Sequence, residues 1–78
     1  MGCNGGLMDD AFKYVRDNGI TTEASYPYTG KGGSCESFTA VVTNKSYKDV
    51  TANSPSQLEA AVQLGPVSVA IEADKTVF

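Results

Sequence analysis

An amphipathic segment near the amino terminus most strongly constrains what this chain can fold into. Residues 7–18 carry apolar side chains at the spacing of one helix face, namely Leu7, Met8, Ala11, Phe12 and Val15. Acidic residues stand in the first turn of this segment and basic residues in its last turn, which matches the helix dipole. The segment therefore predicts a helix over residues 7–18 whose apolar face needs a partner surface.

Residues at both ends of this segment favour the start and the end of a helix. Asn4 or Gly6 can cap its first turn, and Gly19 suits the left-handed conformation that follows a helix. A second set of such signals lies near residue 54. The stretch Ser54-Pro55-Ser56-Gln57 combines a cap, a proline for the first turn and a capping box, and Gly65-Pro66 stops the helix that it predicts.

The remaining segments predict loops and short strands. Residues 20–35 are rich in turn-forming residues and predict a loop. Residues 38–50 are rich in β-branched and aromatic residues, which favours one or two short strands. Residues 67–72 alternate between apolar and other side chains, which predicts a strand with one buried face. Helices and strands together predict the α+β class, and a modest change of composition near residue 50 suggests a passage between two lobes of something larger.

Length, charge and the cysteine count exclude several classes of function. A chain of 78 residues makes at most one small domain. Its six basic residues are scattered and its net charge is −3, so we expect no nucleic-acid partner. Its apolar runs are too short to span a bilayer, so we expect no membrane span. Two cysteines without a histidine cannot fill a zinc site, so we expect no metal.

The glycine-rich start, MGCNGG, raises the question of what approaches its backbone. A phosphate cradle at the helix start is one possibility. No strand precedes this loop, no lysine lies in it, and its spacing matches neither common phosphate-binding motif. A tight turn before the helix is therefore the better interpretation of the residues alone.

The two cysteines allow several interpretations. Cys3 and Cys35 lie too far apart in sequence for a Cys-x-x-Cys redox motif. Neither can act as a nucleophile paired with a histidine of this chain, because the chain has none. They can form a disulfide with each other, or two bridges to segments outside this sequence.

Carboxylate pairs and a glycosylation motif complete the candidates. Asp9 and Asp10 point in different directions on a helix, and Glu72 with Asp74 fits a solvated strand end better than acid–base work. The tripeptide Asn44-Lys45-Ser46 is a sequon for N-glycosylation. Such tripeptides are common by chance, so this one gives only weak support for a secretory route.

Several of these motifs together resemble the papain-like cysteine proteases, and among them the cathepsin L-like members. The resemblance is carried in order by GCNGGLMDDAF, YPYTG, Cys35 and LGPVSVAIEAD, and it covers essentially the whole chain. It implies an internal part of a papain-like α+β fold. Residues 1–50 would form the carboxyl-terminal part of the helical lobe with a Gly-Gly cleft edge, and residues 51–78 the start of the β-rich lobe.

The resemblance implies a role in substrate binding for the glycine-rich start. Gly5 and Gly6 would form a cleft edge that bonds to the backbone of an extended peptide, with Gly6 as the main contact. Leu7, Met8 and Ala70 would wall the pocket for the second residue upstream of the cut bond, and such a pocket favours apolar side chains. Core packing of the helix is the competing interpretation of Leu7 and Met8, and the resemblance favours the pocket, at least for Met8.

The resemblance also places the reactive groups outside these 78 residues. The nucleophilic cysteine, the oxyanion-hole glutamine, the histidine and its orienting asparagine all belong to missing segments, so this chain carries no catalytic residue. Cys3 and Cys35 would each pair with an upstream cysteine rather than with one another. The resemblance implies no cofactor and a lysosomal, vacuolar or secreted parent enzyme, whose disulfides would survive there.

The expectation from the resemblance is thus an inactive fragment of a peptide-cleaving enzyme. We expect that both ends of the sequence are cuts, and that the isolated chain is at best marginally folded with apolar surface exposed. The alternatives are a stand-alone peptide-binding module that has lost the chemistry, and a pseudoprotease of full length with a substituted nucleophile.

Overall fold

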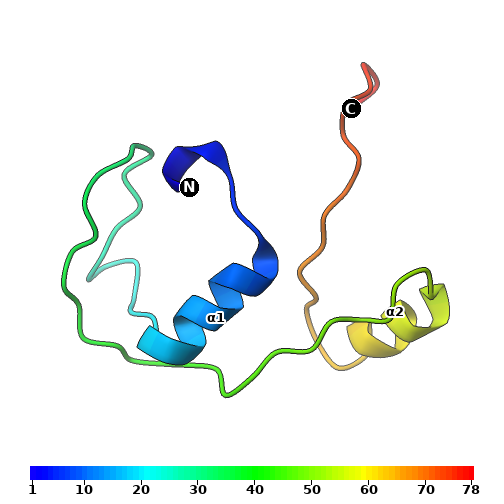
Figure 1. Ribbon diagram of the computed structural model, residues 1–78, viewed down its shortest axis with the longest axis horizontal. Coiled ribbons are helices and arrows are strands. Elements are labelled where there is room, and N and C mark those ends of the chain that lie inside the picture. The colour runs from blue at the N-terminus through cyan, green and yellow to red at the C-terminus, as the bar shows by residue number, and fades with distance from the viewer. The chain divides into compact units, whose positions relative to one another are not determined.

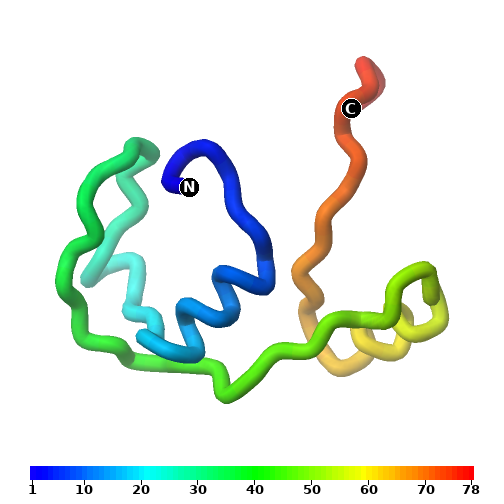
Figure 2. The backbone as a smooth tube through the Cα atoms, viewed as in Figure 1, coloured from blue at the N-terminus to red at the C-terminus, as the bar shows by residue number.

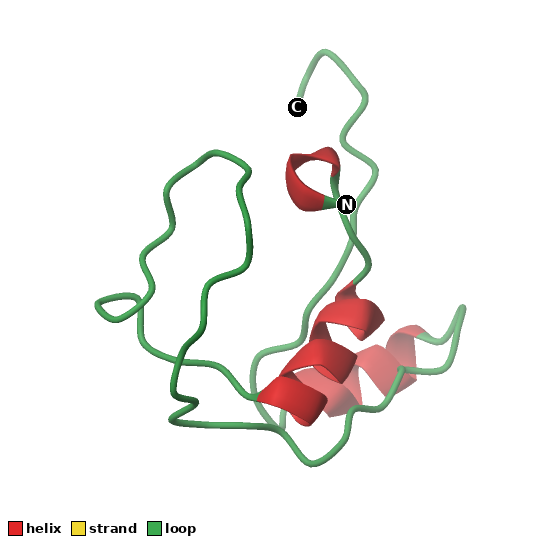
Figure 3. Cartoon of the chain, turned by 60° about the vertical axis from the view of Figure 1, so that its left-hand side comes forward, coloured by secondary structure: helices red, strands yellow, loops and turns green.

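Two α-helices and one short 3-10 helix are the regular elements of the protein. The computed structural model describes residues 1–78, in which η1 spans Gly2–Asn4, α1 spans Met8–Asn18 and α2 spans Pro55–Val62 (Figure 1). The rest of the chain forms turns, bends and extended loops, and Figure 3 shows no strand. The loop predicted over residues 20–35 is confirmed.

The predicted first helix is confirmed, although its amino-terminal cap is not. Leu7 occupies the cap position in extended conformation and makes no side-chain cap bond, so the predicted cap by Asn4 or Gly6 is wrong. Gly5, at φ 112° and ψ −168°, turns the chain between Asn4 and the helix. Asp9 and Asp10 in the first turn still place negative charge near the free N–H groups.

α1 ends at the predicted place, but Gly19 does not adopt the predicted left-handed helical conformation, because its ψ is −176°. Gly19 has φ +74°, in the region that favours glycine, and its N–H donates to Val15 O at 2.7 Å. The next residue, Ile20, then meets Val42 in an isolated antiparallel bridge. Gly19 is the only buried residue of the chain.

The second helix begins at the predicted cap and proline, but without the return bond from the Gln57 side chain that a capping box needs. The Ser54 hydroxyl accepts a hydrogen bond from Gln57 N at 3.4 Å, and Pro55 occupies the first turn. Beyond Val62 the backbone forms tighter turns, with hydrogen bonds between residues three positions apart. Leu64 N donates to Ala61 O at 3.0 Å, and Gly65 N donates to Val62 O at 3.2 Å.

The predicted strands are absent. Residues 38–50 form one backbone bridge, at Val42, and residues 67–72 form no ladder at all. Figure 2 shows the extended path of the latter segment in orange. A strand is stable only when a neighbouring strand takes up its N–H and C=O groups, and no other segment of these 78 residues does so. The helical part of the predicted α+β class is therefore present, and the β part is not.

No apolar side chain is buried, so the chain has no hydrophobic core of its own. Contacts divide it into two compact units, Met1–Lys48 and Asp49–Phe78. Whether these units correspond to the two predicted lobes stays a prediction. The predicted exposure of apolar surface is confirmed, with Leu7 69% and Ile71 65% exposed. Neither helix has the length and apolar character that a membrane span requires.

Candidate functional site

The glycine-rich start forms a turn that leads into α1. Asn4 N donates to Met1 O at 3.1 Å and closes the short η1 helix. Gly5 then adopts φ +112°, a conformation that side-chain-bearing residues rarely adopt. The backbone conformation at residue 5 therefore explains why this residue is glycine.

Nothing within the chain requires residue 6 to be glycine. Its φ lies outside the left-handed region, and a Cβ built on it would meet no atom within 4 Å. Neither backbone strain nor packing within these residues explains the missing side chain. Glycine at such a position leaves room for something that approaches from outside the described residues.

The apolar residues after this turn are available for contact. Leu7 is 69% and Met8 42% exposed, and they follow Gly6 directly at the start of α1. The structure thus keeps Gly5, Gly6, Leu7 and Met8 together as one continuous edge. Ala70 lies on an exposed extended segment of the second unit, so it is described separately from that edge.

Both cysteines are free and exposed in the structure. Cys35 Sγ lies 3.9 Å from the Tyr14 hydroxyl, and this hydrogen bond, helped by partial desolvation, raises the pKa of Tyr14 above its ordinary value. The two groups border a cavity of about 320 Å³ that Tyr26 and Phe38 also line. The sequence motifs do not predict this aromatic setting of Cys35, and among them only YPY, which contains Tyr26, points toward it. That the two cysteines pair with partners elsewhere stays a prediction.

The other candidate groups do not assemble into a reactive site. Lys75 Nζ lies 3.9 Å from Glu72 Oε1 and 3.6 Å from Asp74 Oδ1, so these carboxylates share an exposed ion pair that contributes little. Asp9 and Asp10 belong to the first turn of α1. No group of three or more metal-ligating side chains lies together. These candidate groups therefore form no nucleophile–base pair.

Comparisons with known proteins match the chain over its full length. The family model described as papain family cysteine protease matches residues 1–78. Cysteine proteinase 5 of Dictyostelium discoideum is 54% identical over 99% of this chain and 23% of its own length. Germination-specific cysteine protease 1 of Arabidopsis thaliana is 48% identical, over 99% and 22% respectively. Cathepsin L of Sarcophaga peregrina is 47% identical, over 99% and 24%.

The chain spans less than a quarter of the length of each of these three relatives. No solved structure matches it significantly.

Proposed function

Because this chain belongs to the papain family of cysteine proteases, we propose that it supplies part of the substrate cleft of a cysteine endopeptidase. The complete enzyme would hydrolyse peptide bonds with a cysteine thiolate that is paired with a histidine. Its thiolate would attack the peptide carbonyl and release the amine, and water would then hydrolyse the acyl-thioester. The residues of this chain would bind and orient the substrate for these steps.

The observation that carries this proposal is the family match over residues 1–78, and the open space at Gly6 is consistent with it. An extended peptide bonds to an exposed backbone edge through main-chain N–H and C=O groups, and this needs close approach of the two backbones. The φ of Gly6 and the empty space around it give no reason for glycine within the chain. A substrate backbone that lies against residues 5–6 supplies that reason, because a Cβ on residue 6 would hold it away.

The neighbouring side chains favour an apolar substrate residue. Leu7 and Met8 expose apolar surface at the end of the glycine edge. An apolar wall gains free energy by covering an apolar or aromatic side chain and gives a charged one no partner. We propose that Leu7 and Met8, with Ala70, wall the subsites for the second and third residues upstream of the cut bond.

The proposal extends to the surroundings of the cleft. Cys3 and Cys35 would form disulfides with cysteines outside these residues. The enzyme would act in a lysosome, in a vacuole or outside the cell, where such bridges persist. It would need no cofactor, and its partners would be extended peptides or proteins and the remaining segments of the enzyme.

The test compares two glycine variants in the natural polypeptide that carries this sequence. Gly6→Ala places a Cβ at the proposed edge and should weaken backbone bonds to the substrate. Each such bond contributes about 0.5–1.5 kcal/mol, so we expect kcat/KM for a peptide with an apolar second residue to fall roughly 2- to 10-fold. Gly33→Ala is the matched control, because that glycine also has open space and no positive φ.

The result separates the proposed function from its alternatives. Equal loss in both variants, or in neither, would contradict the assignment of Gly6 to the cleft. Peptide binding that Gly6→Ala weakens, without any hydrolysis by the unmodified polypeptide, would instead support a pseudoprotease or a stand-alone peptide-binding module.

A further inference from the structure

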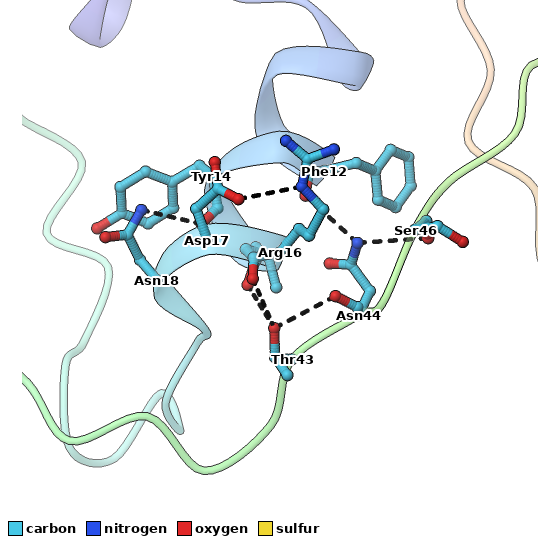
Figure 4. Close-up of polar contacts among 9 residues, drawn as sticks. Phe12, Tyr14, Arg16, Asp17, Asn18, Thr43, Asn44 and Ser46 are labelled. Atoms are coloured by element: carbon cyan, nitrogen blue, oxygen red, sulfur yellow. Dashed lines mark hydrogen bonds and ion pairs between the residues drawn. The ribbon is translucent and has the colours of Figure 1, made fainter.

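A segment that follows α1 by more than twenty residues contacts that helix at Phe12, Val15 and Arg16. Residues 43–47, which we call the strap, contact it through hydrogen bonds, which Figure 4 draws, and through one ring contact. The Thr43 hydroxyl donates to Val15 O at 2.6 Å. Asn44 Nδ2 donates to Phe12 O at 3.3 Å. The ring of Tyr47 stacks on the ring of Phe12 with centroids 6.1 Å apart.

The strap contains the only N-glycosylation sequon of the chain, Asn44-Lys45-Ser46. It has no regular secondary structure, its backbone bends at Lys45, and Lys45 and Ser46 are exposed. An irregular surface segment is where a bulky glycan can be carried without displacing packed side chains. Asn44 itself is half-buried, and its amide nitrogen donates to Phe12 O and, at 3.4 Å, to Ser46 O.

We propose that Asn44 is the acceptor of an N-linked glycan. In this transfer Nδ2 forms a bond to the anomeric carbon of an oligosaccharide carried on a lipid diphosphate. The bond from that carbon to the diphosphate breaks, the diphosphate leaves with the electron pair, and Nδ2 gives up one proton to the transferase. The inference rests on the secretory route that is part of the proposed function.

The contacts of Asn44 determine when the glycan is attached and what the attachment changes. In the folded strap both amide protons have an acceptor, so transfer occurs before the strap docks on α1, as the chain enters the secretory compartment. The product amide keeps one N–H. It can therefore still donate to Phe12 O or to Ser46 O, but not to both.

The experiment determines glycan occupancy of Asn44 in the natural polypeptide isolated from cells that produce it. Treatment with peptide N-glycosidase in heavy-oxygen water converts a glycosylated asparagine into a labelled aspartate. Mass spectrometry detects it in the peptide with residues 32–45, or with residues 32–48 when Lys45 is replaced. Asn44→Gln removes the acceptor. Ser46→Ala removes the sequon and leaves the Asn44 amide in place, and Lys45→Ala is the matched control that keeps the sequon.

We expect label at Asn44 in the wild type and in Lys45→Ala, and none in Asn44→Gln or Ser46→Ala. An unlabelled Asn44 in the wild-type polypeptide would overturn the inference. Peptide hydrolysis by the same preparations separates the two proposals. If the preparation hydrolyses peptides and Asn44 is unlabelled, the glycan proposal is wrong and the protease proposal stands. If Asn44 is labelled and no hydrolysis occurs, the protease proposal is wrong and the glycan proposal stands.

Discussion

At the scale of single residues, Gly19 carries the tightest constraint in the chain. A Cβ at this position would lie 2.5 Å from Ala40 Cβ and 3.1 Å from Val42 O, and the φ of +74° would strain any other residue. We expect Gly19→Ala to lower the free energy of unfolding of the natural polypeptide by about 1–3 kcal/mol. Urea unfolding checks this, with Gly32→Ala as the control in open space. Equal stability of the two variants would contradict it.

A second specific contact of a single residue is made by the Thr43 hydroxyl. It has one proton, and Val15 O at 2.6 Å is its nearest acceptor. Thr43→Val keeps the shape of the side chain and removes this bond, so we expect a loss of about 0.5–1.5 kcal/mol in the free energy of unfolding. Thr51→Val, at another exposed threonine, should change it little. A Thr43 variant as stable as the control would show that the strap does not depend on this bond.

Residue-scale features differ in how well the sequence predicts them. The position of Gly19 after a helix is a local signal, and the structure confirms it. The closeness of Gly19 to Ala40 and the contact of Thr43 with Val15 join residues more than twenty positions apart. No local sequence pattern predicts such contacts, because they depend on how the intervening loop returns to the helix.

At the scale of elements, the start of α2 depends on one side chain. The Ser54 hydroxyl accepts from Gln57 N at 3.4 Å, a long bond. We expect Ser54→Ala to cost about 0.5–1 kcal/mol, the low end of the range for such caps, and to speed amide hydrogen exchange in the first turn of α2. Ser34→Ala, in an exposed loop, is the control. Unchanged exchange in Ser54→Ala would show that Pro55 suffices to start the helix.

The elements also show what a sequence pattern can predict. Both helices were predicted close to their bounds, because a helix satisfies its backbone groups within one segment. The strands over residues 38–50 and 67–72 were predicted and are absent, because alternation sets which face is apolar but not which neighbour pairs. The cap of α1 was placed wrongly, because the extended Leu7 separates the glycine turn from the helix.

At the scale of the whole molecule, the chain lacks the surfaces that its apolar faces need. No apolar side chain is buried, although apolar residues are 41% of the sequence. We expect the isolated 78-residue polypeptide to show partial helix signal, to bind a hydrophobic dye and to melt without a cooperative transition. Circular dichroism during heating checks this. A sharp transition with little dye binding would contradict it and favour a self-sufficient module.

The candidate site was predictable in part at this scale. The family assignment follows from the motifs of the chain, since they are specific in combination, and the comparisons confirm it. The proposed active site needs groups from outside these residues, because the chain has no histidine to pair with a cysteine nucleophile. The roles of Gly5, Gly6, Leu7, Met8 and Ala70 therefore stay predictions that only the complete polypeptide can test.

The most direct test of the central claim is to map where a bound peptide contacts the natural polypeptide. A substrate-like peptide with a photoreactive apolar side chain, two residues upstream of its cleavable bond, is crosslinked and the modified residues are identified by mass spectrometry. Our account predicts crosslinks in the peptide with residues 1–13, at Leu7 or Met8, that an excess of unlabelled substrate prevents. Competed crosslinks that all lie outside this chain would contradict the claim that it forms a wall of the substrate cleft.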